Sequence, residues 1–134
     1  MVGVLVVTHG NLARELVQAA RRIVGDVKEI AALAIDWDAE VSAAGGAIRS
    51  AVQQMNQGQG VLILTDMFGG TPTNISLSFL EEGRVEIITG VNLPMLIKFC
   101  SLRERDDLRR VAESIKEQGQ KQIYIASDVF KHQT

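Results

Sequence analysis

The sequence predicts an α/β fold in which helices cover both faces of a doubly wound, mostly parallel sheet of five strands. Short apolar runs rich in β-branched residues alternate along the chain with segments whose apolar residues recur at helical spacing. Runs of the first kind are typical of strands buried on both faces, and their alternation with helices implies βαβ units with right-handed crossovers. A length of 134 residues corresponds to one domain, which is large enough to bury a core without a disulfide. We therefore expect residues 1–134 to form a single domain.

Five runs of residues are expected to form the strands. The first is Val-Gly-Val-Leu-Val-Val at 2–7, and three more apolar runs follow at 29–35, 61–64 and 85–88. The fifth run, Gln-Ile-Tyr-Ile-Ala at 122–126, alternates and therefore suits an edge of the sheet. With the strands numbered along the chain, we predict the order 2-1-3-4-5.

Helices are expected between these strands, because apolar residues recur there at intervals of three and four. The predicted helical segments are 12–23, 41–55, 71–83, 94–100 and 106–119, the third and the last each ending at a glycine. Thr71-Pro72 is typical of a helix start, with a capping residue followed by a proline at the first helical position. Residues 127–134 are expected to form a loosely held tail.

Composition and charge exclude several classes of function. The chain has 14 basic and 16 acidic side chains and a net charge of −2, which argues against nucleic-acid binding, because that depends mainly on clustered Lys and Arg. The single cysteine, Cys100, cannot form an internal disulfide or supply a cysteine-rich zinc site. No apolar run approaches the roughly 20 residues of a membrane span, and the N-terminus lacks a secretion signal. We therefore expect a cytoplasmic protein without direct membrane insertion.

The expected site lies between the first and third strands, where the strand order reverses. Ligands of open α/β sheets bind beyond the carboxyl ends of the strands at this point. Thr8-His9-Gly10 follows the first strand, and Thr-Asp-Met-Phe-Gly-Gly-Thr-Pro-Thr-Asn follows the third at 65–74. One of the two histidines therefore lies close to an aspartate, Asp66, and a glycine-rich turn.

This set of residues suits the transfer of a phosphoryl group. If Asp66 accepts the N–H of one ring nitrogen of His9, the other nitrogen presents its lone pair outward as a nucleophile. Gly69 and Gly70 permit backbone conformations that aim N–H groups inward, and the N-termini of two expected helices, which favour anions, converge here. Further hydroxyl groups are available from Thr8, Thr71 and Thr73.

Three other residues lie outside this set. Trp37, between two aspartates after the second strand, is expected to cap the core, to line the rim of the site or to meet a partner. Cys100 lies among apolar residues at helical spacing and is expected to pack in the core. His132 lies in the polar tail, where we expect it to take no part in the chemistry.

Three motifs in this order resemble the IIA component of the mannose-type (mannose/fructose/sorbose) sugar phosphotransferase system. They are Val-Val-Thr-His-Gly at 6–10, Leu-Thr-Asp-Met-Phe-Gly-Gly-Thr-Pro-Thr-Asn at 64–74 and Gly-Val-Asn-Leu-Pro-Met-Leu at 90–96. The resemblance covers essentially the whole chain, and the combination of the three motifs is highly specific.

The resemblance implies a phosphoryl carrier, which is a phosphotransferase that uses no metal or other cofactor. His9 would receive a phosphoryl group from the phosphocarrier protein HPr and pass it to a histidine of a IIB component during sugar uptake, while Asp66 orients the ring. The phosphoryl-binding positions are then Thr8, Gly10, Gly69, Gly70 and Thr71, and the partner or rim positions are Met67, Phe68, Trp37, Asn92 and Pro94.

The resemblance also bears on assembly and partners. Members of the family are homodimers that exchange a C-terminal strand onto the partner's sheet edge, and the run at 122–126 is the candidate for that strand. No IIB domain follows the IIA-type domain, so the phosphoryl acceptor is expected to be a separate chain. Met67-Phe68 and Thr71-Pro72-Thr73 stand where better-known members often have Trp and Ser-Pro-Phe, and the sequence does not indicate which sugar, if any, is transported.

Other protein classes remain as alternatives. A stand-alone regulatory IIA protein, which signals carbon status through its phosphorylation state, would use the same chemistry at His9. A response-regulator receiver would phosphorylate an aspartate after the third strand, but it needs acidic residues after the first strand, where Thr8 and His9 stand. Metal chelatases and histidine phosphatases need a second histidine in the site, and His132 is a poor candidate.

Overall fold

The strand that carries His9 is β1 (Gly3–His9), an inner strand that is buried along almost its whole length in the computed structural model, which describes residues 1–130. β1 pairs in parallel with β2 (Ile30–Ile35) on one side and with β3 (Val61–Thr65) on the other, and β4 (Val85–Thr89) pairs in parallel with β3. The order β2-β1-β3-β4 of this four-stranded sheet confirms the predicted α/β class and the predicted order of the first four strands.

Helices follow the strands, as the alternation of patterns predicts. They are α1 (Leu12–Val24), α2 (Val41–Met55), α3 (Thr71–Leu77), α4 (Leu93–Ser101), α5 (Leu108–Lys121) and α6 (Ala126–Phe130). The start of α3 differs from the prediction by one position, because Gly70 is the capping residue and Pro72 is the second residue of the helix. The glycine-rich turn therefore runs directly into α3.

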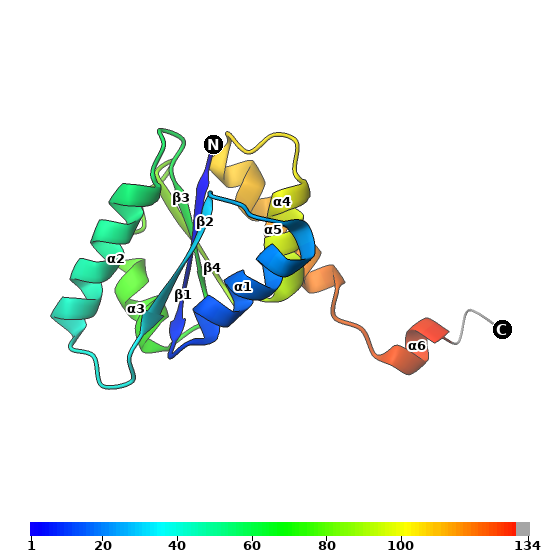
Figure 1. The fold of residues 1–134 in the computed structure, drawn as a ribbon, viewed down its shortest axis with the longest axis horizontal. Coiled ribbons are helices and arrows are strands. Elements are labelled where there is room, and N and C mark those ends of the chain that lie inside the picture. Colours follow the sequence, from blue (N-terminus) through cyan, green and yellow to red (C-terminus); the bar gives the residue numbers. More distant parts are fainter. Residues whose placement is uncertain (131–134) are drawn as a thin grey trace.

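The sheet carries helices on both of its faces (Figure 1). α1, α4 and α5 cover one face, and α2 and α3 cover the other. Successive side chains of a strand point to opposite faces. Val4 and Val6 of β1 therefore join the core beneath α1, α4 and α5, whereas Leu5 and Val7 join the core beneath α2 and α3. Burial on both faces explains why the strand is a continuous apolar run rather than an alternating one.

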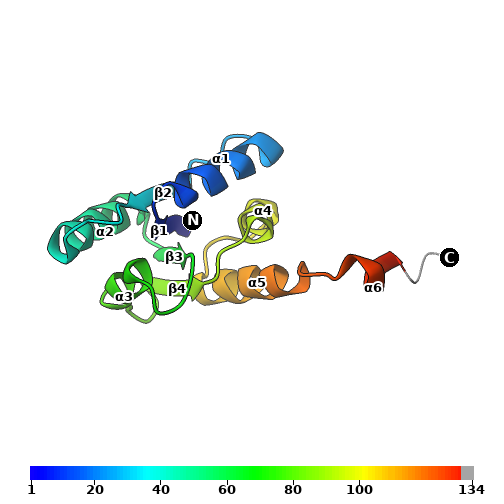
Figure 2. The same cartoon turned by 90° about the horizontal axis from the view of Figure 1, so that it is seen from below.

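The segment after α5 does not add a fifth strand to the sheet of its own chain. α5 ends at Lys121 with Gln122 as its capping residue, residues 123–125 have no regular structure, and α6 begins at Ala126. Figures 1 and 2 both show this segment leading away from the sheet, so its backbone has no neighbouring strand with which to form a ladder. Ile123, Tyr124 and Ile125 are exposed as a result. The alternating pattern indicates an edge strand, but it does not place that strand beside a sheet of the same chain.

The predicted tail at 127–134 lies partly in α6. All five residues of this short helix are exposed. His132 lies outside the described residues. In residues 1–130, no helix combines the length and the apolar character that crossing a membrane requires.

Candidate functional site

His9 and Asp66 lie side by side at the carboxyl ends of two neighbouring strands. His9 is the last residue of β1, and Asp66 directly follows β3. The parallel register pairs Val7 with Thr65, so the two segments leave the sheet at the same edge. Nδ1 of His9 lies 2.7 Å from Oδ2 of Asp66, and the same oxygen accepts a hydrogen bond from the His9 backbone N–H at 3.1 Å. The structure thus brings together His9 and Asp66, the two residues that the sequence places where the strand order reverses.

The charge of this pair determines which ring nitrogen is free. Burial raises the pKa of Asp66, but hydrogen bonds from the His9 side chain and backbone, together with attraction to the His9 ring, outweigh burial and lower the pKa below its usual value. Asp66 is therefore ionised at neutral pH and can only accept hydrogen bonds. Nδ1 of a neutral His9 ring must then carry the proton, which leaves the lone pair on Nε2. Nε2 is the ring atom available as a nucleophile.

The glycine-rich turn passes beside the Nε2 side of the His9 ring. A Cβ atom on Gly70 would lie 2.7 Å from Cε1 and 3.3 Å from Nε2 of His9. Gly69 has a φ of 87°, a conformation that other residues rarely adopt. α3 begins immediately afterwards at Thr71, and the first N–H groups of a helix have no partner within the helix. The backbone of the turn at Gly70 therefore lies close to any group bound to Nε2.

The threonines of the site differ in what their hydroxyls can reach. Thr8 is fully buried, and its hydroxyl accepts a hydrogen bond from a backbone N–H in the first turn of α1 at 2.7 Å. Thr73 is also fully buried, and its hydroxyl bonds to the Thr65 hydroxyl and to the Met67 carbonyl, which ties the turn to the end of β3. Thr71 is exposed, so its hydroxyl is open to a ligand. The predicted contact of Thr8 with a phosphoryl group does not fit this burial, and Thr8 instead fixes the start of α1.

Exposed apolar side chains form the rim of the site. Met67 and Phe68 in the glycine-rich turn and Trp37 in the loop after β2 are all exposed, as their predicted rim positions require. The Trp37 ring stacks on the His9 ring. Gly10, which we predict to bind a phosphoryl group, donates its backbone N–H to the Ile35 carbonyl at 2.8 Å, so this N–H is already in use.

Asn92 and Pro94 build the start of α4. The Asn92 side chain accepts a hydrogen bond from the N–H of Met95 at 3.2 Å and donates one to the Gly119 carbonyl in α5 at 3.1 Å. Asn92 therefore joins α4 to α5, whereas the sequence predicts that Asn92 lies at the rim of the site. A signal for the capping role is present in the sequence, because asparagine is a preferred capping residue and Pro94 follows two positions later, in the first turn of the helix.

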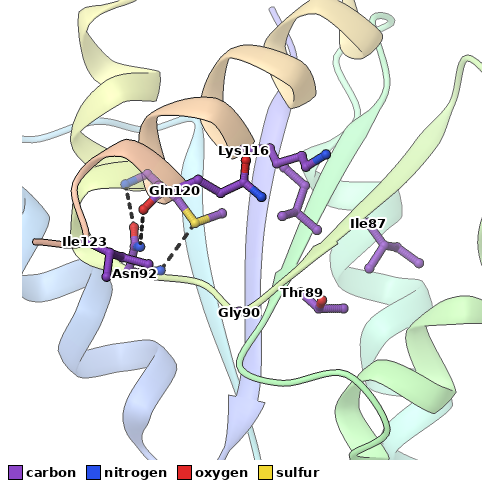
Figure 3. Close-up of a pocket in the computed structure, with 10 residues that line it drawn as sticks. Ile87, Thr89, Gly90, Asn92, Lys116, Gln120 and Ile123 are labelled. Atoms are coloured by element: carbon purple, nitrogen blue, oxygen red, sulfur yellow. Dashed lines mark hydrogen bonds between the residues drawn. The ribbon is translucent and has the colours of Figure 1, made fainter.

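Sequence reasoning gave no sign of a pocket of about 380 Å³ along the free edge of β4. Figure 3 shows Ile87 and Thr89 of β4 on one side of this pocket and Lys116 and Gln120 of α5 on the other. Ile123, the second residue beyond the end of α5, also lines it. The pocket is thus lined both by β4, the edge strand of the sheet, and by Ile123 of the segment 122–126, which the sequence predicts to be an edge strand.

Metal-ligating side chains and the Cys100 thiol are the other groups that could carry chemistry. Across residues 1–130, no three His, Cys, Asp or Glu side chains lie together in a way that could hold a metal ion. Cys100 packs against the core beneath α1, α4 and α5, which confirms its predicted packing role. Burial raises the pKa of the Cys100 thiol, so it stays protonated and unreactive at neutral pH.

The sequence and fold are similar to a defined group of proteins. Residues 3–116 match the model of the EIIA-man family, described as PTS system fructose IIA component. The PTS system fructose-specific EIIA component of Bacillus subtilis (strain 168) is 29% identical over 129 residues, which are 96% of this chain and 88% of that protein. A PTS IIA protein associated with the fucose utilization operon of Streptococcus pneumoniae is 27% identical with a TM-score of 0.83, over 96% of this chain and 95% of that one. The EIIA structure from Streptococcus agalactiae, 20% identical with a TM-score of 0.85 over 96% and 99% of the two chains, shows the same fold.

Proposed function

This chain belongs to the EIIA-man family, the mannose/fructose-type IIA components of the sugar phosphotransferase system, and on that premise we propose that it carries a phosphoryl group on Nε2 of His9. The donor is phospho-HPr, and the acceptor is a histidine of a IIB component. The single observation that carries the proposal is the 2.7 Å contact between Nδ1 of His9 and Oδ2 of Asp66. That contact leaves Nε2 as the nucleophile of the ring.

The transfer follows from the charges of the pair. The Nε2 lone pair attacks the phosphorus of phospho-HPr, the P–N bond of the donor breaks, and its electron pair returns to the donor imidazole. The proton on Nδ1 stays in place, so the phosphorylated His9 ring gains a positive charge that the Asp66 carboxylate offsets. The second transfer, to the IIB histidine, runs through the same steps in reverse. The donor is already a high-energy phosphoramidate, so the proposal needs no metal ion.

The turn from Gly69 to Thr71 supports the phosphoryl group in this proposal. Its backbone N–H groups and the Thr71 hydroxyl can donate hydrogen bonds to phosphoryl oxygens, and donors placed in advance stabilise charge without reorganisation. The close approach of Gly70 to Cε1 and Nε2 of His9 puts this backbone beside the reacting nitrogen. Catalysis then consists mainly of positioning and electrostatic stabilisation.

Reconstitution tests the proposal. The protein is incubated with enzyme I, HPr and phosphoenolpyruvate, and the intact mass is recorded before and after brief acid treatment. We expect one acid-labile phosphoryl group per chain, and its appearance should require HPr. The proposal places the protein in the cytoplasm together with these partners. A chain that stays unmodified, or that is modified without HPr, would contradict the proposed donor.

Gly70→Ala is expected to slow phosphorylation of His9 by about 10- to 100-fold, because small misplacements of reacting groups have effects of this size. A Cβ atom 2.7 Å from Cε1 forces the ring or the turn to move. The measurement is the single-turnover rate with phospho-HPr. Gly46→Ala in α2 is the matched control, because a Cβ there meets open space. An unchanged rate for Gly70→Ala would show that the turn does not support the transferring group.

The proposal also includes a homodimer. β4 pairs with β3 on one side, and the pocket of Figure 3 lies along its other side. Residues 122–126 project from the same chain with exposed apolar side chains. An open sheet edge and an unpaired alternating segment are complementary, so this segment of each chain is proposed to add to the β4 edge of its partner.

Charged residues in this segment are expected to prevent assembly. We predict that a variant carrying both Ile123→Lys and Ile125→Lys sediments as a monomer, whereas the unmodified chain sediments as a dimer. Ile23→Lys in α1 replaces another exposed isoleucine and should leave the dimer intact. Analytical ultracentrifugation of the three proteins makes the comparison. A dimer that persists in the double variant would contradict the proposed exchange.

A further inference from the structure

The indole ring of Trp37 lies on the face of the His9 imidazole ring. The ring centroids are 4.8 Å apart, and the ring planes are inclined by 20°. Trp37 belongs to the loop between β2 and α2 and is 78% exposed, so burial in the core does not explain its position.

Gly10 makes room for this stack. A Cβ atom on Gly10 would lie 3.2 Å from Nε1 of Trp37, which is tighter than most side-chain contacts. The φ of Gly10 is 56°, a conformation that favours glycine. Gly10, which directly follows His9, therefore leaves the space in which Trp37 stacks on the His9 ring.

The stack restrains the His9 ring in a way that Asp66 does not. The hydrogen bond from Nδ1 to Asp66 fixes one atom of the ring, and a single contact of this kind leaves the ring able to tilt about it. Nε2 lies on the far side of the ring from Nδ1, so it moves most when the ring tilts. A nearly parallel aromatic surface opposes this tilt, because tilting breaks the face-to-face contact.

We propose that Trp37 is a positioning residue for phosphoryl transfer at His9, which holds Nε2 toward the incoming phosphorus and stabilises the charge on the phosphorylated ring. This inference rests on the proposed function, in which Nε2 accepts the phosphoryl group and the ring becomes positively charged. Aromatic faces attract cations within about 6 Å of the ring centroid. The separation of 4.8 Å between the two rings falls within that range.

A docking contact at the rim is the competing role for an exposed tryptophan, and it makes a different prediction. A residue that only binds the protein donor affects transfer from phospho-HPr and changes its KM. A residue that positions His9 affects transfer from every donor and changes the rate at saturation. Phosphoramidate, a small phosphoryl donor with no docking surface, separates the two roles.

For Trp37→Ala, we expect the rate of His9 phosphorylation to fall about tenfold with either donor, with the KM for phospho-HPr within about twofold of the wild-type value. Trp37→Phe keeps a flat aromatic face and should restore the rate to within about threefold of wild type. Ile23→Ala removes another exposed apolar side chain and should have the wild-type rate with both donors.

Fluorescence gives a second readout, because Trp37 is the only tryptophan in the sequence. Its emission is expected to change when His9 is phosphorylated, since the charge of the stacked ring changes. His9→Gln should remove this response. Emission that does not respond to phosphorylation of the wild-type protein would contradict the stack.

The outcomes distinguish this inference from the proposed function. A loss of rate confined to phospho-HPr, or a wild-type rate of Trp37→Ala with phosphoramidate, would overturn the positioning role. If the wild-type protein accepts no phosphoryl group at His9 from either donor, the proposed function itself fails. The proposed function and the positioning role are both supported if the wild-type protein is phosphorylated at His9, Trp37→Ala is phosphorylated slowly with either donor, and Trp37→Phe has nearly the wild-type rate.

Discussion

Replacing His9 with alanine is expected to abolish phosphorylation of this chain by phospho-HPr. The substitution removes the ring whose Nε2 is the proposed nucleophile of the transfer. His9 is partly exposed at the end of β1, so the core stays intact. Intact mass spectrometry after incubation with enzyme I, HPr and phosphoenolpyruvate measures the effect.

The other histidine supplies the matched control. His132→Ala is expected to be phosphorylated at the wild-type rate, because His132 lies in the tail and outside the predicted site. Circular dichroism of both variants verifies that they fold. The reverse pattern, with phosphorylation lost in His132→Ala and kept in His9→Ala, would overturn the site assignment.

Asp66→Asn is expected to lower the rate of phosphoryl transfer about 100-fold, which corresponds to a loss of roughly 2.7 kcal/mol of transition-state stabilisation. Asparagine keeps the shape of the side chain but removes the negative charge 2.7 Å from Nδ1. The neutral amide no longer offsets the positive charge of the phosphorylated ring. Rapid-quench kinetics with phospho-HPr measure the rate, and a wild-type rate would show that Asp66 is only a turn residue.

The thermal stability of Asp66→Asn should depend on pH in a defined way. The pKa of Asp66 is lowered in the folded protein, so the ionised carboxylate stabilises the fold above its ordinary pKa and loses this effect as the pH falls through the lowered value. We expect the wild-type protein to have the higher Tm at neutral pH and the difference to shrink as the pH falls below the ordinary pKa of an aspartate. A Tm difference that grows on acidification would contradict the assigned ionisation.

The sheet and the central pair of the site were accessible from the sequence for a physical reason. Strands buried on both faces must be continuous apolar runs, so the runs that become β1 to β4 stand out from the amphipathic helices between them. Parallel strands end at one edge of the sheet, which brings the residues after β1 and β3 together. The proximity of His9 and Asp66 follows from that topology.

The remaining features depend on contacts that sequence patterns do not encode. The alternation at 122–126 indicates an edge strand but does not specify the chain to which that edge belongs. The stack of Trp37 on His9 depends on the path of the loop after β2, which has no periodic pattern. The hydroxyl of Thr8 looks equally suited to a ligand or to a helix start until its burial and its partner in α1 are known.

Asp66 holds Nδ1 of His9, and we propose that Nε2 therefore accepts the phosphoryl group. Phosphorylation of protein labelled with ¹⁵N at histidine, followed by long-range ¹H–¹⁵N and ³¹P spectra, identifies the modified nitrogen directly. The 2.7 Å contact between Nδ1 and Oδ2 of Asp66 predicts a phosphoryl group on Nε2 of His9 and a proton retained on Nδ1. A phosphoryl group on Nδ1 of His9, or on any other residue, would contradict this account.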